Sequence, residues 1–172
     1  AMLFAIQAWA VDAPASWAAQ EVYALEELGM VPQYLQQDYT AAMTREDFCS
    51  LLVQVMEVSG CVNMPEGTEN PFTDTDNPRI IAAYQLHVVG GMGDGTFRPD
   101  LKVTRQEAAV MLANAITHAF QADVDLGKSL VFSDQKDIDP WARSSVDYIT
   151  AAGVMSGTGK GFEPQGYYTR EQ

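Results

Sequence analysis

The chain has 172 residues, of which 47% are hydrophobic, so it can bury the core of one ordinary domain or of a short array of small units. It carries 23 acidic and 10 basic residues, which gives a formal net charge of −13. Such a charge argues against nucleic acid as a main partner, because phosphate contacts supply most of that affinity, and against adsorption to an anionic membrane.

The chain begins with an apolar segment, residues 1–12, that includes MLFAIQAWA. This run is shorter than the roughly 20 residues of a membrane-spanning helix and lacks the basic flank of a signal peptide, so we expect no insertion into a membrane. The next stretch, residues 16–30, has a serine cap, apolar residues at helical spacing and a terminal glycine. Together these features predict a helix.

The sequence TRED at 44–47 opens a second helical pattern. A threonine followed three residues later by an acid or amide is a capping box, in which both side chains bond backbone N–H groups at the start of a helix. Cys49 lies early in this helix and Cys61 just beyond its end, roughly 13 Å away along the axis. A disulfide needs Cα atoms within about 7 Å, so we expect both thiols to be free.

The same order of elements occurs twice more. Residues 72–107 and 132–172 both read Phe-Ser/Thr-Asp, a helix, a glycine loop, Phe-x-Pro and a capping box. The boxes are TRQE at 104–107 and TREQ at 169–172. In the segment 132–172, Asp139 supplies a cap, Pro140 a proline at the first helical position, and Gly153 the end of the helix.

The boxes begin at residues 44, 104 and 169, so they lie 60 and 65 residues apart. We interpret the chain as three tandem helix–loop–helix units at residues 13–69, 70–129 and 130–172, of which the third is incomplete because the sequence stops at its box. A unit of this size cannot bury its apolar faces alone, so the units should pack on one another. The predicted fold class is therefore mainly α.

Each box places an arginine at the first helical position, namely Arg45, Arg105 and Arg170. A cation there faces the positive end of the helix dipole, at a cost of typically about 0.3–1 kcal/mol, so three in matched places need a cause. An arginine beside free helix N–H groups makes a good anion receptor, and we favour this interpretation. The alternative is an arginine that folds back onto a neighbouring carboxylate.

Other motifs have less specific explanations. The loop GGMGDG lacks the context of a nucleotide-binding loop, so we interpret it as a turn in which Gly93 and Gly95 adopt positive φ and orient Asp94. The stretch DTDN at 74–77 does not complete an EF-hand, so no metal site is predicted. No catalytic constellation occurs, so we expect neither an enzyme nor a cofactor.

These features resemble the S-layer homology (SLH) family. The resemblance covers roughly residues 13–172 and is carried by FTD and FSD, by the WA pairs at 17–18 and 141–142, by GDGTFRPD at 93–100, and by the three boxes. It implies three units in a mostly helical, pseudo-threefold arrangement. It also implies non-covalent anchoring of an exported protein to the bacterial cell wall or S-layer.

The partner that the resemblance implies is an acidic, most often pyruvylated, secondary cell-wall polysaccharide held in grooves between units. The parent protein could carry an attached catalytic or surface-array domain. By the same resemblance the box arginines contact the acidic substituent, so Arg105→Ala is expected to leave the fold intact and to weaken binding to cell-wall sacculi. The residues expected to bind ligand are Arg45, Arg105, Arg170, Trp17, Trp141, Asp74, Asp134, Gly93 and Asp94.

Two alternatives remain open for these residues. The aspartates more often cap helices or turns, and helical tryptophans more often lie in a core. The alternative function is a structural or protein-interaction module that keeps the fold without binding glycan. The second unit departs from the pattern because its first helix is short and has no tryptophan. The third lacks the helix after its box, and we predict that residues 2–10 form a helix in or near the vacant slot.

Overall fold

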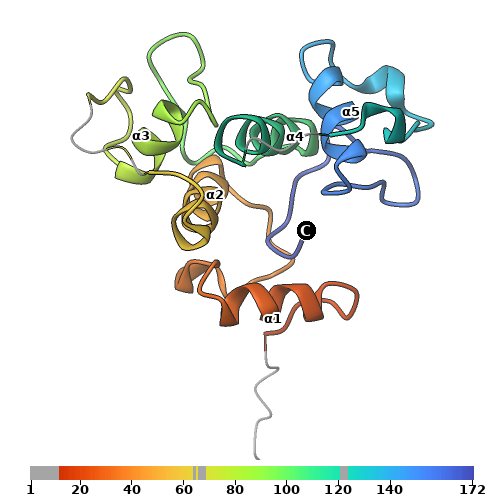
Figure 1. Ribbon diagram of the computed structural model, residues 1–172, viewed down its shortest axis with the longest axis horizontal. Helices are drawn as coiled ribbons and strands as arrows, with labels where there is room; N and C mark the ends of the chain where they lie inside the picture. The colour runs from red at the N-terminus through yellow and green to blue at the C-terminus, as the bar shows by residue number, and fades with distance from the viewer. Residues whose placement is uncertain (1–11, 64, 66–68, 121–123) are drawn as a thin grey trace, which may run out of the picture.

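The structure is a computed structural model that describes residues 12–63, 65, 69–120 and 124–172. The predictions made for residues 2–10 lie outside the described residues. The α-helices, in chain order, are α1 (Ala19–Glu27), α2 (Arg45–Ser59), α3 (Pro78–Gln85), α4 (Arg105–Asn114) and α5 (Arg143–Ala151) (Figure 1). The shorter elements are η1 (Gln33–Leu35), the π-helical η2 (Ala115–Phe120), η3 (Leu126–Lys128) and η4 (Gln135–Asp137). The part of the chain that is described contains no β-strand, so the mainly α prediction is confirmed.

Capping boxes start α2 and α4 as the sequence predicts. The hydroxyl of Thr44 accepts the N–H of Asp47 at 3.1 Å, and the Asp47 carboxylate accepts the N–H of Thr44 at 3.4 Å. At α4 the Thr104 hydroxyl accepts the N–H of Glu107 at 3.4 Å, and the Glu107 carboxylate accepts the N–H of Thr104 at 2.8 Å. Each box therefore satisfies an N–H group that a helix start would otherwise leave free.

The two cysteines are both free thiols, as predicted. Cys49 is fully buried in α2, and this burial raises the pKa of its thiol to about 12. Cys61 lies beyond the end of α2 and is exposed.

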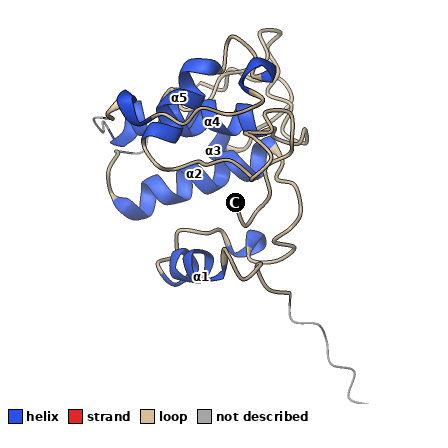
Figure 2. Cartoon of the chain, turned by 90° about the vertical axis from the view of Figure 1, so that its right-hand side faces the viewer, coloured by secondary structure: helices blue, strands red, loops and turns tan. Residues whose placement is uncertain are grey.

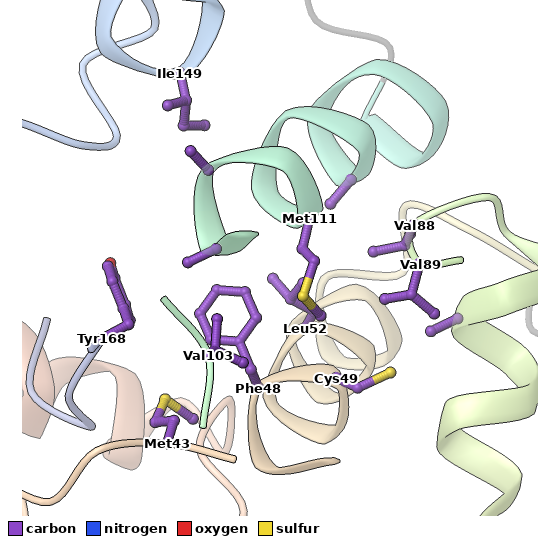
Figure 3. Packing of buried hydrophobic residues seen from close by; sticks show 14 of the residues in the cluster. Met43, Phe48, Cys49, Leu52, Val88, Val89, Val103, Met111, Ile149 and Tyr168 are labelled. Atoms are coloured by element: carbon purple, nitrogen blue, oxygen red, sulfur yellow. The ribbon is translucent and has the colours of Figure 1, made fainter. Parts of the chain in front are cut away.

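The helices pack in pairs that join one unit to the next. α2 packs on α3, and α4 packs on α5, so the second helix of one unit covers the first helix of the following unit. Between the pairs lies a continuous apolar core, in which Met111 of α4 points toward Leu52 of α2 and Phe48 lies close by (Figure 3). Helices that the sequence assigns to neighbouring units therefore pack on each other at these two junctions.

A ring of three backbone hydrogen bonds joins the segments that precede the three boxes. Met43 N–H donates to the carbonyl of Tyr168 at 2.9 Å, Tyr168 N–H to that of Val103 at 2.9 Å, and Val103 N–H to that of Met43 at 3.0 Å. All three residues are buried, and each lies two positions before a box arginine. The ring therefore fixes where the three arginines begin their helices.

The helix α1 lies apart from the other helices, and the C-terminus of the chain lies between them (Figures 1 and 2). No residue of α1 is buried, although its N-cap residue Ala18 is. By contrast, α5 buries Val146, Ile149 and Thr150. The first and third units thus differ in packing although their helices share a sequence pattern.

Candidate functional site

The side chain of Arg105 crosses from the second unit to the glycine loop of the third. Its Nε donates to the carbonyl of Phe162 at 2.8 Å, and its Nη2 donates to the carbonyl of Ser156 at 2.7 Å. The guanidinium carbon lies 5.2 Å from the centre of the Phe162 ring, within cation–π range. Only 6% of Arg105 is exposed, so the side chain fastens two units together.

Arg45 makes the same contacts between the first and second units. Its Nε donates to the carbonyl of Phe97 at 3.0 Å, and its Nη2 donates to that of Gly90 at 3.3 Å. Its guanidinium carbon lies 4.6 Å from the centre of the Phe97 ring. Because the contacts recur with the same donor atoms, Arg45 and Arg105 have equivalent positions.

The prediction of free N–H groups beside these arginines is wrong. The N–H of Arg105 donates to the carbonyl of Gly166 at 2.8 Å, and the N–H of Gln106 donates to that of Pro164 at 3.0 Å. In the first turn of α2, the N–H of Arg45 donates to the carbonyl of Leu101 at 2.8 Å. These acceptors come from the next unit, so local sequence gave no sign of them.

Arg170 binds differently from the other two box arginines. Its Nη1 donates to the carbonyl of Gln37 at 2.8 Å, and its guanidinium pairs with Asp47 at 3.6 Å and with Asp38 at 4.0 Å. Its Nε is buried and has no hydrogen-bond partner among the described residues. The carboxylate alternative therefore holds for Arg170, whereas Arg45 and Arg105 bind backbone carbonyls.

A cavity of about 430 Å³ opens beside Arg105. Trp17, from the first unit, lies on its wall and is 63% exposed, and the loop from Val154 to Thr158 forms another wall. Within the described part of the chain, Arg105 Nη1 makes no hydrogen bond. It does not belong to the buried atoms that lack a partner, so a ligand can reach it. The cavity thus joins two predicted site residues, a tryptophan and an arginine with one donor to spare.

The cavity is positively charged at this arginine. Burial lowers the pKa of Arg105 from its ordinary value, and the neighbouring Tyr168, Glu163 and Asp134 oppose this effect. An arginine remains protonated at neutral pH in spite of such shifts. The site can therefore hold an acidic group at its arginine and an apolar ring face at its tryptophan.

Two of the three predicted aspartates, Asp134 and Asp74, cap loops. Asp134 accepts the N–H of Phe162 at 2.8 Å and that of Glu163 at 2.7 Å. Asp74 accepts the N–H of Phe97 and that of the next residue, both at 2.8 Å. These bonds hold the loop whose carbonyls receive the box arginine. Neither aspartate lines the cavity beside Arg105.

The glycine loop of the second unit has the predicted backbone. Gly93 has φ 86° and Gly95 has φ 82°, which confirms that both adopt the left-handed region. The Asp94 carboxylate accepts hydrogen bonds from the hydroxyl and the N–H of Thr96 and pairs with Arg98 at 3.1 Å. These bonds, with the Thr96 hydroxyl first, lower the pKa of Asp94 to about 2. None of these residues lines the cavity beside Arg105.

Trp141, the other predicted tryptophan, is exposed just before α5 and does not line this cavity. Sequence reasoning missed the phenylalanine under the guanidinium group of Arg45 and of Arg105, and the carbonyls that receive these groups. It also missed the pair in which the Gln106 amide donates to the Asp139 carboxylate at 2.7 Å and accepts the N–H of Asp139 at 3.1 Å. The Phe-x-Pro motif after each glycine loop was the available signal for the phenylalanines.

The chain is similar in sequence to known proteins. Residues 71–109 and 131–172 match the family model described as S-layer homology domain. The chain is 24% identical over 164 residues to an amylopullulanase of Thermoanaerobacterium thermosulfurigenes, which covers 94% of this chain and 9% of that protein. It is 34% identical over 82 residues to the S-layer protein sap of Bacillus anthracis, which covers 48% of this chain and 9% of that protein.

A third relative is cell surface glycoprotein 1 of Acetivibrio thermocellus, 32% identical over 103 residues, which covers 58% of this chain and 4% of that protein. The chain thus spans a small part of the relatives it matches. None of the helices in the described residues has the length and apolar character needed to cross a bilayer. The matched domains and the S-layer and cell-surface relatives indicate anchoring to the cell envelope, outside the cell at the wall or S-layer. Two segments of the chain, residues 71–109 and 131–172, are therefore identified as S-layer homology domain sequence.

Proposed function

We propose that the cavity beside Arg105 binds an acidic substituent on a secondary cell-wall polysaccharide, and that this substituent is a pyruvyl group. The observation that carries the proposal is the unpaired Nη1 of Arg105 in a cavity that also contains the exposed Trp17. A carboxylate on the sugar would accept a charge-assisted hydrogen bond from Nη1. The apolar face of a sugar ring would pack on the indole.

The size and lining of the cavity support a sugar rather than a macromolecular surface. Its volume of about 430 Å³ falls within the range of small-ligand sites. The hydroxyl of Thr158 and the backbone of Gly157 supply polar groups at its wall, as recognition of a hydroxylated ligand requires. Because Arg105 is already held by two carbonyls, its remaining donor is preorganised and little rotamer entropy is lost on binding.

We infer a second, equivalent groove at Arg45, whose side chain uses the same two donors and also keeps Nη1 unbonded among the described residues. Trp141 and the loop residues Gly93 and Asp94 would belong to this groove. At Arg170 the pairing with Asp47 and Asp38 lowers the capacity for another anion, so this position would contribute least. The matched contacts also support the proposed units, 13–69, 70–129 and 130–172, and a pseudo-threefold arrangement.

We further propose that the chain itself is not catalytic. Several relatives have names of polysaccharide-degrading enzymes, among them the amylopullulanase and an endoglucanase of Bacillus sp.. An attached catalytic domain in the parent protein is therefore part of the proposal.

A second candidate function, a structural module without glycan binding, is favoured by one observation. The arginines and aspartates of the family motif all have structural partners here.

Binding to purified cell-wall sacculi tests the proposal, with and without chemical removal of the secondary polymer. Trp17→Ala is the informative variant because its side chain is exposed and its loss should not change stability. We expect about tenfold weaker binding, which corresponds to about 1.4 kcal/mol. Tyr23→Ala, an exposed aromatic of α1 outside the cavity, is the matched control. Undiminished binding by Trp17→Ala, or binding that survives removal of the polymer, would favour the structural module.

A further inference from the structure

The two histidines of the chain, His87 and His118, lie against each other although they are far apart in the sequence. The centres of their imidazole rings are 5.8 Å apart. Both residues are exposed, so an ion in solution can reach the rings. Neither histidine lines the cavity beside Arg105, so the proposed function does not account for their meeting.

His87 occupies a position at which the corresponding helices α1 and α5 are followed by glycine. The N–H of His87 donates to the carbonyl three residues earlier at 3.0 Å, as do the N–H groups of Gly29 at 2.9 Å and Gly153 at 3.1 Å. The φ angle of His87 is 58°, close to the 70° and 73° of the two glycines. A residue with a side chain is strained in this left-handed region, whereas glycine is not. The second unit therefore keeps an imidazole where glycine would fit better.

His118 lies in η2, the π-helical continuation of α4. π-helical turns are rare and occur frequently at functional sites. By contrast, α2 stays α-helical at the matched distance from its box, where Val58 takes the place of His118. The Nδ2 of Asn114, at the end of α4, donates to the carbonyl of Val88 at 3.2 Å. Because Val88 is fully buried and directly follows His87, this bond holds the backbones that carry the two imidazoles together.

We propose that His87 and His118 bind one divalent transition-metal ion through one nitrogen of each ring. A bond from Zn²⁺ to an imidazole nitrogen is about 2.0–2.1 Å long, so the ion lies about 3 Å from each ring centre and the two centres lie about 4.5–6 Å apart, depending on the angle at the metal. The observed separation of 5.8 Å falls within this range.

The donor set defines the class of ion. Imidazole nitrogens suit Zn²⁺, Ni²⁺ and Cu²⁺, whereas Ca²⁺ and Mg²⁺ prefer oxygen ligands. The net charge of −13 attracts every cation to the surface, so discrimination among cations has to come from the two rings. Among the described residues no cluster of three metal-ligating side chains occurs, so water would fill the remaining coordination positions. The bound ion would join the exit of α3 to the continuation of α4.

Titration of the 172-residue chain, without an affinity tag, with Ni²⁺ in a calorimeter tests the proposal. His87→Gly and His118→Val each remove one ligand, and each introduces the residue that the matched position of another unit carries, so the fold should be kept. Each variant should bind Ni²⁺ about tenfold more weakly or worse, because the second imidazole binds within the same molecule. The double variant should lose little beyond either single variant, since the two rings act as one site. Ca²⁺, which reports on the acidic surface, should bind all four chains alike.

An affinity for Ni²⁺ that stays within twofold of the unchanged chain in either single variant would overturn the proposal, because the ion would then be held elsewhere, as by the exposed thiol of Cys61. A second measurement covers a variant that folds poorly. Ni²⁺ should raise the thermal midpoint of the unchanged chain by several degrees, because it binds the folded state, and should leave that of His118→Gln unchanged. An equal rise in both chains would likewise overturn the proposal.

Discussion

The helices α1 and α5 are the same element in two settings. Both follow a Trp-Ala pair, both have nine residues, and both end at a glycine with φ near 70°. Yet α5 buries Ile149 completely under α4, whereas α1 buries none of its residues. The difference lies in the neighbouring helix and not in the sequence of the helix itself, so burial here is a property of the junction.

The box arginines show the same contrast. At the junction with α5, Arg105 binds two carbonyls of the next unit and lies on a phenylalanine ring. At the junction with α1, Arg170 has one carbonyl and two carboxylates, and its Nε has no partner among the described residues. The first unit has Gln37 where the other two have phenylalanine, so the ring is missing there. The junction between the third box and the first unit is therefore weaker than the junction at Arg105.

The largest effect is expected from truncating matched helix residues. Ile149→Ala removes a fully buried side chain and should lower the free energy of unfolding by about 2–5 kcal/mol. Leu25→Ala removes a side chain that is 40% exposed and should cost less than about 1 kcal/mol. Urea denaturation of the two variants measures both values. Equal losses would mean that α1 is covered in solution as fully as α5 is.

The next effect concerns the arginines. Arg105→Ala leaves two carbonyls without donors and should lower stability by about 2–3 kcal/mol. The expectation from sequence, that the variant keeps its fold and binds sacculi more weakly, is thereby extended with a predicted loss of stability. Arg170→Ala loses one carbonyl bond and partly exposed ion pairs, so about 1 kcal/mol is expected. Arg105→Lys should recover only part of the loss, because lysine lacks the planar fork that reaches both carbonyls. A loss at Arg170 as large as that at Arg105 would contradict the ranking of the junctions.

Much of the local structure was accessible from sequence because its causes are local. The capping boxes at Thr44 and Thr104 and the free cysteines follow from spacing within one element. The partners of Arg105 could not be predicted, because Ser156 and Phe162 lie more than 50 residues away. For the same reason the pairing of Trp17 with Arg105 in one cavity required the tertiary structure.

A third prediction isolates the local backbone from the packing. Gly29 has φ 70° and Gly153 has φ 73°, and in both a Cβ atom would meet no other atom within 4 Å. Alanine at either position has only the strain of the left-handed region to overcome, about 1 kcal/mol. The two variants should therefore lose the same stability within error, although their helices differ in burial. A clearly larger loss for Gly153→Ala would show that the packing of α5 depends on the backbone conformation just after its C-terminal end.

The smallest expected effect concerns the aspartates that cap the loops, and it depends on pH. Burial alone would raise the pKa of Asp134, but the N–H groups of Phe162 and Glu163 outweigh it and hold the pKa below its usual range. Because the folded pKa is depressed, the carboxylate stabilises the fold above its unfolded pKa of about 3.9, and this contribution is lost as the pH falls through the folded pKa. Asp134→Asn should lower the free energy of unfolding at pH 7, measured by urea denaturation, by less than about 1 kcal/mol, since the group is partly solvated.

Below pH 4 the difference between Asp134→Asn and the unchanged chain should shrink toward zero. Asp12, which accepts only the N–H of Asp38 among the described residues, is the matched position in the first unit. Its asparagine variant should show a smaller difference at pH 7, because one hydrogen bond instead of two is affected. A pH-independent loss at Asp134 would mean that the shape of the side chain, and not its charge, holds the loop. An equal loss at Asp12 would mean that the first loop is as firmly held as the third, and the weakness of that junction would then lie in the missing helix cover of α1 alone.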